Sequence, residues 1–262
     1  MKVRYVWLGL ALAGAPLSAK PVPRVAVPTQ ANLAALKHAC DRLAGAMTPD
    51  SAIPQQIDSI IASMLQAMLQ RDPSFAALNQ KYPGLTGAIA VRARPLMIDG
   101  SKTVLPLYRA ELSQLYCETM TLAEANAAAA FVGSVDGQAL LTSTFANLNF
   151  KASVGTLMQG TDASTSDVRA DMTNAAKRTV DGMLPAQLQR VTQFFATPAG
   201  RKMIAIGPRK TALQQKWFNY SPPGLDDRVA SATAGAGTAC TAAVLQVGGW
   251  LKSVYRRFVN AN

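Results

Sequence analysis

The sequence predicts an all-α protein, a multi-helix array in which two related helix-elbow-helix units pack against N-terminal helices. Aromatic residues make up only 6% of a chain that is rich in alanine. Alanine has the best helix propensity, whereas strands favour branched and aromatic side chains. Apolar residues recur at helical spacing over most of the chain. In addition, the stretch 120–140 is similar in sequence to the stretch 183–203, which lies 63 positions later.

The 262 residues are enough to bury a sizeable core as one large or two small domains. Stretches of proline, glycine and small polar residues, which favour turns and loops, divide the chain into five segments. They are a signal peptide (1–19), an N-terminal helical region (20–104), a first, divergent repeat unit (105–158), a second repeat unit (159–220), and a linker with a C-terminal helix (221–262).

The first segment has the three zones of a secretory signal peptide: two basic residues, an apolar run over 6–15, and small residues before Lys20. We expect cleavage near Ala19. Cleavage after Ala15 fits the small-residue rule better, but it would place Pro16 beside the scissile bond. The apolar run is shorter than the roughly 20 residues that span a bilayer, and no long uncharged apolar segment follows. We therefore expect a periplasmic or secreted protein whose mature chain has no transmembrane segment.

Helical patterns fill the N-terminal region after a proline-rich lead-in at 20–28. Thr29 can cap a helix that runs to about Met47. The clearest amphipathic stripe of the chain follows at the i, i+3, i+4, i+7 spacing of a buried helix face. Its members are Ile53, Ile57, Ile60, Ile61, Met64, Leu65 and Met68. A short helix over 74–81, a helix over 85–97 and a turn at Asp99-Gly100 complete this region.

The first unit is predicted to contain helices over 106–119, 122–132 and 137–150. Thr121 and Glu124 have the spacing of a capping box. A loop over 159–166 separates the units, since this stretch lacks apolar periodicity. In the second unit we expect helices over 167–181, from Pro185, and from Pro198, with a bend near 207–208 and a continuation to about Tyr220.

Each unit has an elbow between its last two helices, and the two elbows share a phenylalanine, a hydroxyl residue and a glycine at equivalent positions. The elbow residues are Phe131, Ser134 and Gly137 in the first unit, and Phe194, Phe195, Thr197, Pro198 and Gly200 in the second. A glycine inside a helix costs up to about 1 kcal/mol relative to alanine. Its presence at both equivalent positions predicts a close helix contact that leaves no room for a Cβ atom.

The motifs LPAQ at 184–187, FF at 194–195 and TPAGRK at 197–202 resemble the signature of the DUF2059 family of exported bacterial proteins. The resemblance is clear over 165–220 and weak over 105–150, where Val132 replaces the second aromatic residue, Val135 the proline and Gln138 the basic residue. It implies an all-helical fold and an envelope location, and it implies no particular activity.

Few side chains carry recognisable chemistry. His38 is the only histidine; with Asp41 it gives at most two metal ligands on one helix face, whereas structural zinc takes four. No serine has the surroundings of a nucleophile elbow, and no glycine-rich phosphate loop occurs. Carboxylates that could serve a hydrolase are Glu111, Glu118 and Glu124, although a solvated helix face explains them more simply. We expect no cofactor and no metal.

Three cysteines in an exported protein allow one disulfide and one remaining thiol. We predict that Cys40 pairs with Cys240, which would tie the N-terminal helix to the C-terminal one. Cys117 would then be a small buried apolar residue.

The formal net charge of +11 favours anionic partners, although it does not choose among them. Basic residues lie after the second elbow and among aromatic residues near the C-terminus, a mixture that suits an anionic membrane surface. The candidate contacts are Arg201, Lys202, Lys252, Arg256 and Arg257. We therefore expect a non-catalytic protein that binds a partner protein or an anionic envelope component, with nucleic acid the less favoured partner. The alternatives are a carboxylate-dependent envelope hydrolase and a basic protein that binds the membrane surface.

Overall fold

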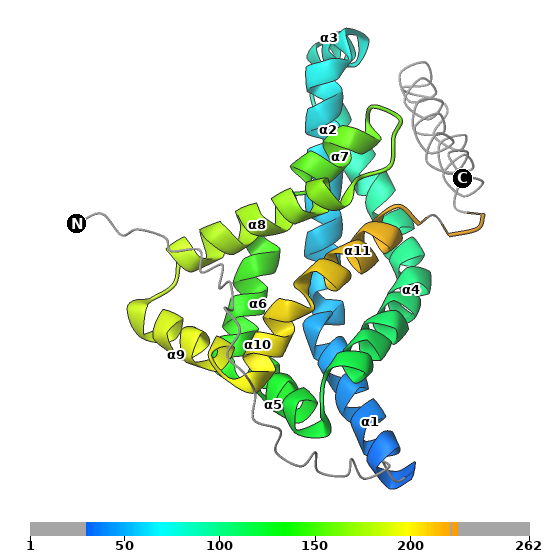
Figure 1. The fold of residues 1–262 in the computed structure, drawn as a ribbon. Helices are drawn as coiled ribbons and strands as arrows, with labels where there is room; N and C mark the ends of the chain where they lie inside the picture. The colour runs from blue at the N-terminus through cyan, green and yellow to red at the C-terminus, as the bar shows by residue number, and fades with distance from the viewer. Residues whose placement is uncertain (1–29, 221, 225–262) are drawn as a thin grey trace, which may run out of the picture.

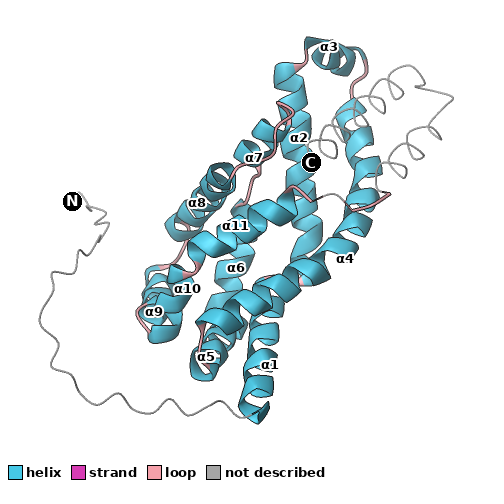
Figure 2. Cartoon of the chain, turned by 45° about the vertical axis from the view of Figure 1, so that its right-hand side comes forward, coloured by secondary structure: helices cyan, strands magenta, loops and turns pink. Residues whose placement is uncertain are grey.

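The computed structural model describes residues 30–220 and 222–224, and every regular element among them is helical (Figures 1 and 2). The predicted all-α helical array is therefore confirmed. The predicted signal peptide, the lead-in at 20–28, the Thr29 cap and the C-terminal helix lie outside the described residues, as do Cys240, Lys252, Arg256 and Arg257.

The described chain begins with α1 and a short 3-10 turn, and then passes through ten further helices. The elements are α1 (Gln30–Met47), η1 (Asp50–Ala52), α2 (Ile53–Arg71), α3 (Pro73–Lys81), α4 (Leu85–Thr119), α5 (Leu122–Gly133), α6 (Val135–Asn147), α7 (Lys151–Leu157), α8 (Thr165–Asp181), α9 (Pro185–Phe195), α10 (Pro198–Ala205) and α11 (Gly207–Phe218).

The predicted stripe of α2 forms the first of two apolar cores. Its residues Ile57, Ile61, Leu65 and Met68 are buried together with side chains from α3 and the first part of α4. The turn into α3 is set by Asp72, whose Oδ1 accepts hydrogen bonds from the backbone N–H groups of the first helical turn at 2.9 and 3.0 Å. This N-cap satisfies donors that a helix start leaves without partners. α3 thereby reverses the chain, so that α4 packs back along α2.

One long helix, α4, replaces the two shorter helices and the intervening turn that the sequence predicts at Asp99-Gly100. It has 35 residues and contains Pro95 and Pro106, so the predicted boundary at 104/105 falls inside it. The turn prediction is wrong because tertiary packing outweighs local propensity. The first part of α4 is anchored in the α2 core and its last part in a second core. Proline inside a helix bends it, and α4 is visibly bowed in Figure 1.

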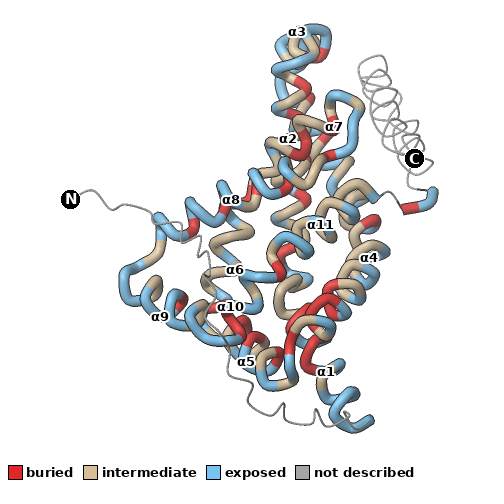
Figure 3. Tube along the Cα trace, viewed as in Figure 1, coloured by how far each residue is buried: buried red, intermediate tan, exposed pale blue. Residues whose placement is uncertain are grey.

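The second core joins α1, the end of α4, α5, α10 and α11. In Figure 3 the buried segments gather where α1, α4 and α5 meet. Ala39 and Ala44 of α1 and Ala125 and Ala128 of α5 are almost completely buried, and such small side chains allow the two helices to approach closely. The capping box predicted for Thr121 and Glu124 is present at the start of α5. The alanine-rich composition therefore serves close helix packing.

The helix predicted over 137–150 ends at Asn147 as α6, and a separate short helix, α7, begins at Lys151. The first turn of α7 is held by a side chain from α8. Asp171 of α8 is buried, and its carboxylate accepts hydrogen bonds from the N–H of Ala152 (2.9 Å), the N–H of Ser153 (2.9 Å) and the Ser153 hydroxyl (2.7 Å). A negative charge at a helix N-terminus is favourable. Asp171 therefore both caps α7 and locks it onto α8.

Replacing Asp171 with alanine is expected to lower the free energy of unfolding by about 2–3 kcal/mol, because it leaves buried donors without an acceptor. Urea denaturation measures this change. Asp162→Ala is the matched control, since Asp162 is exposed and makes no interaction with the described residues. Equal stability of the two variants would show that the cap contributes nothing.

Candidate functional site

At the second elbow, between α9 and α10, the hydroxyl of one side chain makes the hydrogen bonds that hold the turn. Thr197 caps α10: the Gly200 N–H donates to its Oγ1 at 3.1 Å, and its hydroxyl donates back to the Phe194 carbonyl at 2.6 Å. That carbonyl also accepts from the Thr197 N–H at 2.9 Å. Pro198 takes the first position of α10, where a backbone N–H would have no partner.

The first elbow has the same hydrogen bonds around Ser134. The Gly137 N–H donates to Ser134 Oγ at 3.2 Å, and the hydroxyl donates to the Phe131 carbonyl at 2.6 Å. In both elbows a Cβ added to the glycine would meet the backbone carbonyl oxygen six residues earlier, at 2.0 Å in the first and 2.2 Å in the second. Only glycine fits there without a backbone shift.

The two elbows lie against each other. The equivalent rings of Phe131 and Phe194 stack with centroids 3.7 Å apart, and Phe195 meets Phe131 edge-on. Helices of the first unit also pack on helices of the second. α5 packs on α10 and α6 packs on α9, while α4 packs on α11 and α6 packs on α8. Two copies of one unit related by a twofold axis would give this arrangement. These contacts are consistent with internal duplication, which stays a hypothesis.

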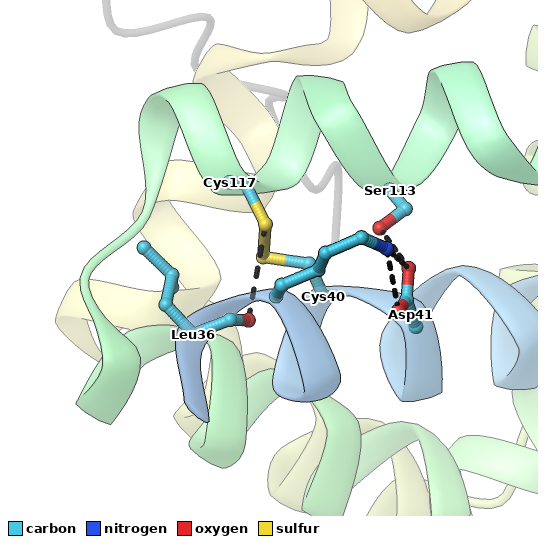
Figure 4. Close-up of polar contacts among 6 residues, drawn as sticks. Leu36, Cys40, Asp41, Ser113 and Cys117 are labelled. Carbon is cyan, nitrogen blue, oxygen red and sulfur yellow. Dashed lines mark hydrogen bonds and ion pairs between the residues drawn. A yellow bond between two sulfur atoms is a disulfide. The ribbon is translucent and has the colours of Figure 1, made fainter. Parts of the chain in front are cut away.

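The predicted pairing of Cys40 with Cys240 is wrong in the structure, which bonds Cys40 to Cys117 (Figure 4). α1 packs along the end of α4 and brings the two Cα atoms to 5.7 Å, within the usual range for a disulfide. The Leu36 carbonyl lies 3.8 Å from Cys117 Sγ. The bond joins α1 to the helix that connects the two cores, a link that spacing along the sequence does not reveal.

A polar cluster borders the disulfide on the same two helices. Lys37 forms an ion pair with Asp41 at 2.8 Å, and the buried Ser113 hydroxyl donates to Asp41 at 2.6 Å (Figure 4). The hydrogen bonds from Lys37 and then from Ser113 lower the pKa of Asp41. His38 is exposed and Cys40 is in the disulfide, so His38, Cys40 and Asp41 do not form a metal site. No group of three or more metal-capable side chains occurs within residues 30–220 and 222–224.

The three carboxylates considered for hydrolysis are committed to other contacts. Glu111 pairs with Lys216 and Glu118 with Arg209, each at 2.6 Å, while Glu124 closes the α5 capping box. The hydrogen bond from Arg209 lowers the pKa of Glu118, and the Thr121 backbone lowers the pKa of Glu124. Both acids are therefore ionised at neutral pH, whereas a general acid needs a raised pKa.

The α4–α11 seam, which we define by Tyr108, Tyr116, Lys210 and Gln214, contains further polar groups between the two helices. Tyr116 is fully buried and its hydroxyl has no hydrogen-bond partner. Tyr108 is hydrogen-bonded to Gln214. Burial raises the pKa of both tyrosines and lowers the pKa of Lys210 to about 8. The sequence shows Lys210 only as one base in a basic run; its place on the inner face of α11 emerges from the fold.

The acidic side chains of the described chain are almost all used internally. Each forms an ion pair or a helix-capping hydrogen bond, apart from Asp162 and Asp181. Many basic side chains have no such partner. Two of them, Arg169 and Lys177, lie on the exposed face of α8, which also carries the exposed Val180. The described surface therefore carries basic side chains that no described acid neutralises.

Exposed apolar side chains accompany these bases from α8 to α10. Leu184, just before α9, is 72% exposed, and Ile204 on α10 is 61% exposed. Arg201 and Lys202, the predicted anionic contacts on α10, are both exposed. Arg201 donates to the Ala196 carbonyl. We call this set, together with Arg169, Lys177 and Val180, the α8–α10 surface. Lys177 and Val180 are three residues apart on α8, and Arg201 and Ile204 are three residues apart on α10, so on each helix a base lies beside an apolar side chain.

Within the described chain, no helix is both long enough and apolar enough to cross a membrane. Comparison of the chain with protein-family models, with curated proteins and with solved structures gives no match.

Proposed function

We propose that this chain is an exported, non-catalytic helical protein whose α8–α10 surface binds anionic phospholipid at an envelope membrane. The observation that carries the proposal is the pairing of exposed bases with exposed apolar side chains on that surface. Bases are attracted to anionic headgroups, and apolar side chains beside them enter the headgroup boundary. The choice is also supported by Arg169 and Lys177, which form no ion pair with a described acid and so keep their charge available to an external anion.

Export is a separate part of the proposal. It is supported by the Cys40–Cys117 bond, since disulfides persist in oxidising compartments, and by the predicted signal peptide. The resemblance to the DUF2059 family rests on the residues of the second unit and is proposed on that basis alone.

Co-sedimentation with lipid vesicles tests the lipid proposal. The mature protein should bind vesicles of equal parts phosphatidylglycerol and phosphatidylcholine, bind phosphatidylcholine alone much more weakly, and lose binding as salt rises. Arg169→Gln/Lys177→Gln should weaken binding by roughly tenfold to thirtyfold, at about 1 kcal/mol for each base.

Lys81→Gln/Arg92→Gln is the matched control, because it also removes one exposed lysine and one exposed arginine, but on α3 and α4. This variant should bind as the wild type does. An equal loss of vesicle binding in the two double variants would show that binding depends on net charge alone. It would contradict the assignment of binding to the α8–α10 surface. Absence of binding to anionic vesicles would reject lipid as the ligand and favour a partner protein.

A further inference from the structure

The two ends of the Cys40–Cys117 bond differ in their surroundings. Cys40 is a member of the second core and is completely buried. Cys117 packs against the outside of that core and is only partly buried. The bond, which joins α1 to α4 in Figure 4, therefore has Cys40 inside the core and Cys117 at its rim.

The helix positions of the two residues explain this difference. Cys40 lies one turn before the buried Leu43, on the inner face of α1. On α4, the buried Tyr116 precedes Cys117 and the exposed Glu118 follows it. Successive residues of a helix are about 100° apart, so Cys117 lies between the inner and the outer face of α4. An external molecule can approach Cys117 from solvent, whereas Cys40 is enclosed.

This difference decides which cysteine can react with an external molecule. Disulfides form by thiol–disulfide exchange, in which a thiolate attacks a disulfide sulfur and gives a mixed disulfide. The rate depends on access to the attacking thiol. The Cα atoms of Cys40 and Cys117 are 5.7 Å apart. Once Cys117 carries a mixed disulfide, Cys40 is therefore in place to attack it.

We propose that Cys117 is the exchange site of this chain, the residue that reacts with an external oxidant. The oxidant is a protein or a small molecule with a reactive disulfide. The deprotonated Cys117 thiol attacks one sulfur of the oxidant, whose S–S bond breaks, and the second sulfur leaves as a thiolate. The Cys40 thiolate then attacks Cys117 Sγ and releases the first oxidant sulfur. The chain loses two electrons and two protons, and the oxidant gains them as it becomes a pair of thiols.

The proposal places the formation of the bond after folding. Because Cys117 lies at the rim of the core, it can react when α1 already packs on α4. No residue of the α8–α10 surface takes part, so the test of this proposal is independent of lipid binding.

Two single-thiol variants of the mature protein test the assignment. Cys40→Ala/Cys240→Ser keeps Cys117, and Cys117→Ala/Cys240→Ser keeps Cys40, so both lack the bond equally. Each is incubated with oxidised glutathione in native buffer, and intact-mass spectrometry follows the mixed disulfide. Cys117 should react about tenfold faster than Cys40 or more, and the two rates should become similar in urea that unfolds both variants.

Equal rates for the two thiols in native buffer would contradict the proposal, as would a reaction of Cys117 that requires urea. The latter result would show that the bond forms only before the chain folds.

A chain that keeps both Cys40 and Cys117 tests the assignment even if the single-thiol variants do not fold. Reduced Cys240→Ser is mixed with oxidised glutathione, and the exchange is quenched with acid after short times. Peptide mass spectrometry should find glutathione on Cys117 and not on Cys40. Glutathione mainly on Cys40, in equal amounts on both residues or on neither would overturn the assignment.

Discussion

Replacing both Cys40 and Cys117 with alanine is expected to lower the free energy of unfolding by about 4 kcal/mol. The bond joins residues 77 positions apart, and a cross-link over a loop of that length removes much of the conformational entropy of the unfolded chain. The bond also holds α1 against the end of α4, where most of the second core lies. Guanidinium denaturation of the oxidised wild type and the double variant measures the difference.

Cys240→Ser is the matched control, because Cys240 takes no part in this bond. It should leave stability unchanged, and alkylation of the non-reduced wild type should modify one thiol. Modification at Cys117 in place of Cys240 would show that the bond joins Cys40 to Cys240 and would contradict the structure.

Replacing Gly200 with alanine is expected to cost about 3–4 kcal/mol, the upper end for inserting atoms into a packed site. The new Cβ would lie 2.2 Å from the Phe194 carbonyl oxygen and 2.5 Å from the Phe195 Cα atom. These are backbone atoms, so relief requires the elbow to open. Opening would also separate the stacked rings of Phe131 and Phe194. Thermal and urea unfolding both report the loss.

Gly87→Ala provides the comparison, since Gly87 lies within α4 and a Cβ there meets nothing within 4 Å. That variant should gain about 0.5–1 kcal/mol from better helix propensity. Wild-type stability of Gly200→Ala would mean that the elbow is more open than the structure shows.

The features that the sequence predicted correctly are those that depend on residues close together in the chain. The apolar stripe of α2 and the Thr121 capping box depend on neighbours within a few residues, and both are present. The turn at Asp99-Gly100 is absent because α4 is held at both ends by cores that the local sequence does not reveal.

The features missed in the candidate sites depend on contacts between distant segments. The disulfide partner of Cys40 follows from the packing of α1 on α4. The helix-capping role of Asp171 requires α8 to lie beside α7. Lys210 became distinct from its basic neighbours only when the register of α11 on α4 was known. In each case the residue type was visible in the sequence, but its partner was not.

The most direct test of lipid contact at the α8–α10 surface is the polarity around a single fluorophore. In a Cys240→Ser background, an environment-sensitive dye can be attached at Leu184→Cys or, as the control, at Val91→Cys; the native residues are 72% and 73% exposed. With vesicles containing phosphatidylglycerol, the emission of the dye at position 184 should shift to the blue and that at position 91 should not. An unchanged spectrum at position 184, or an equal shift at both positions, would contradict the account.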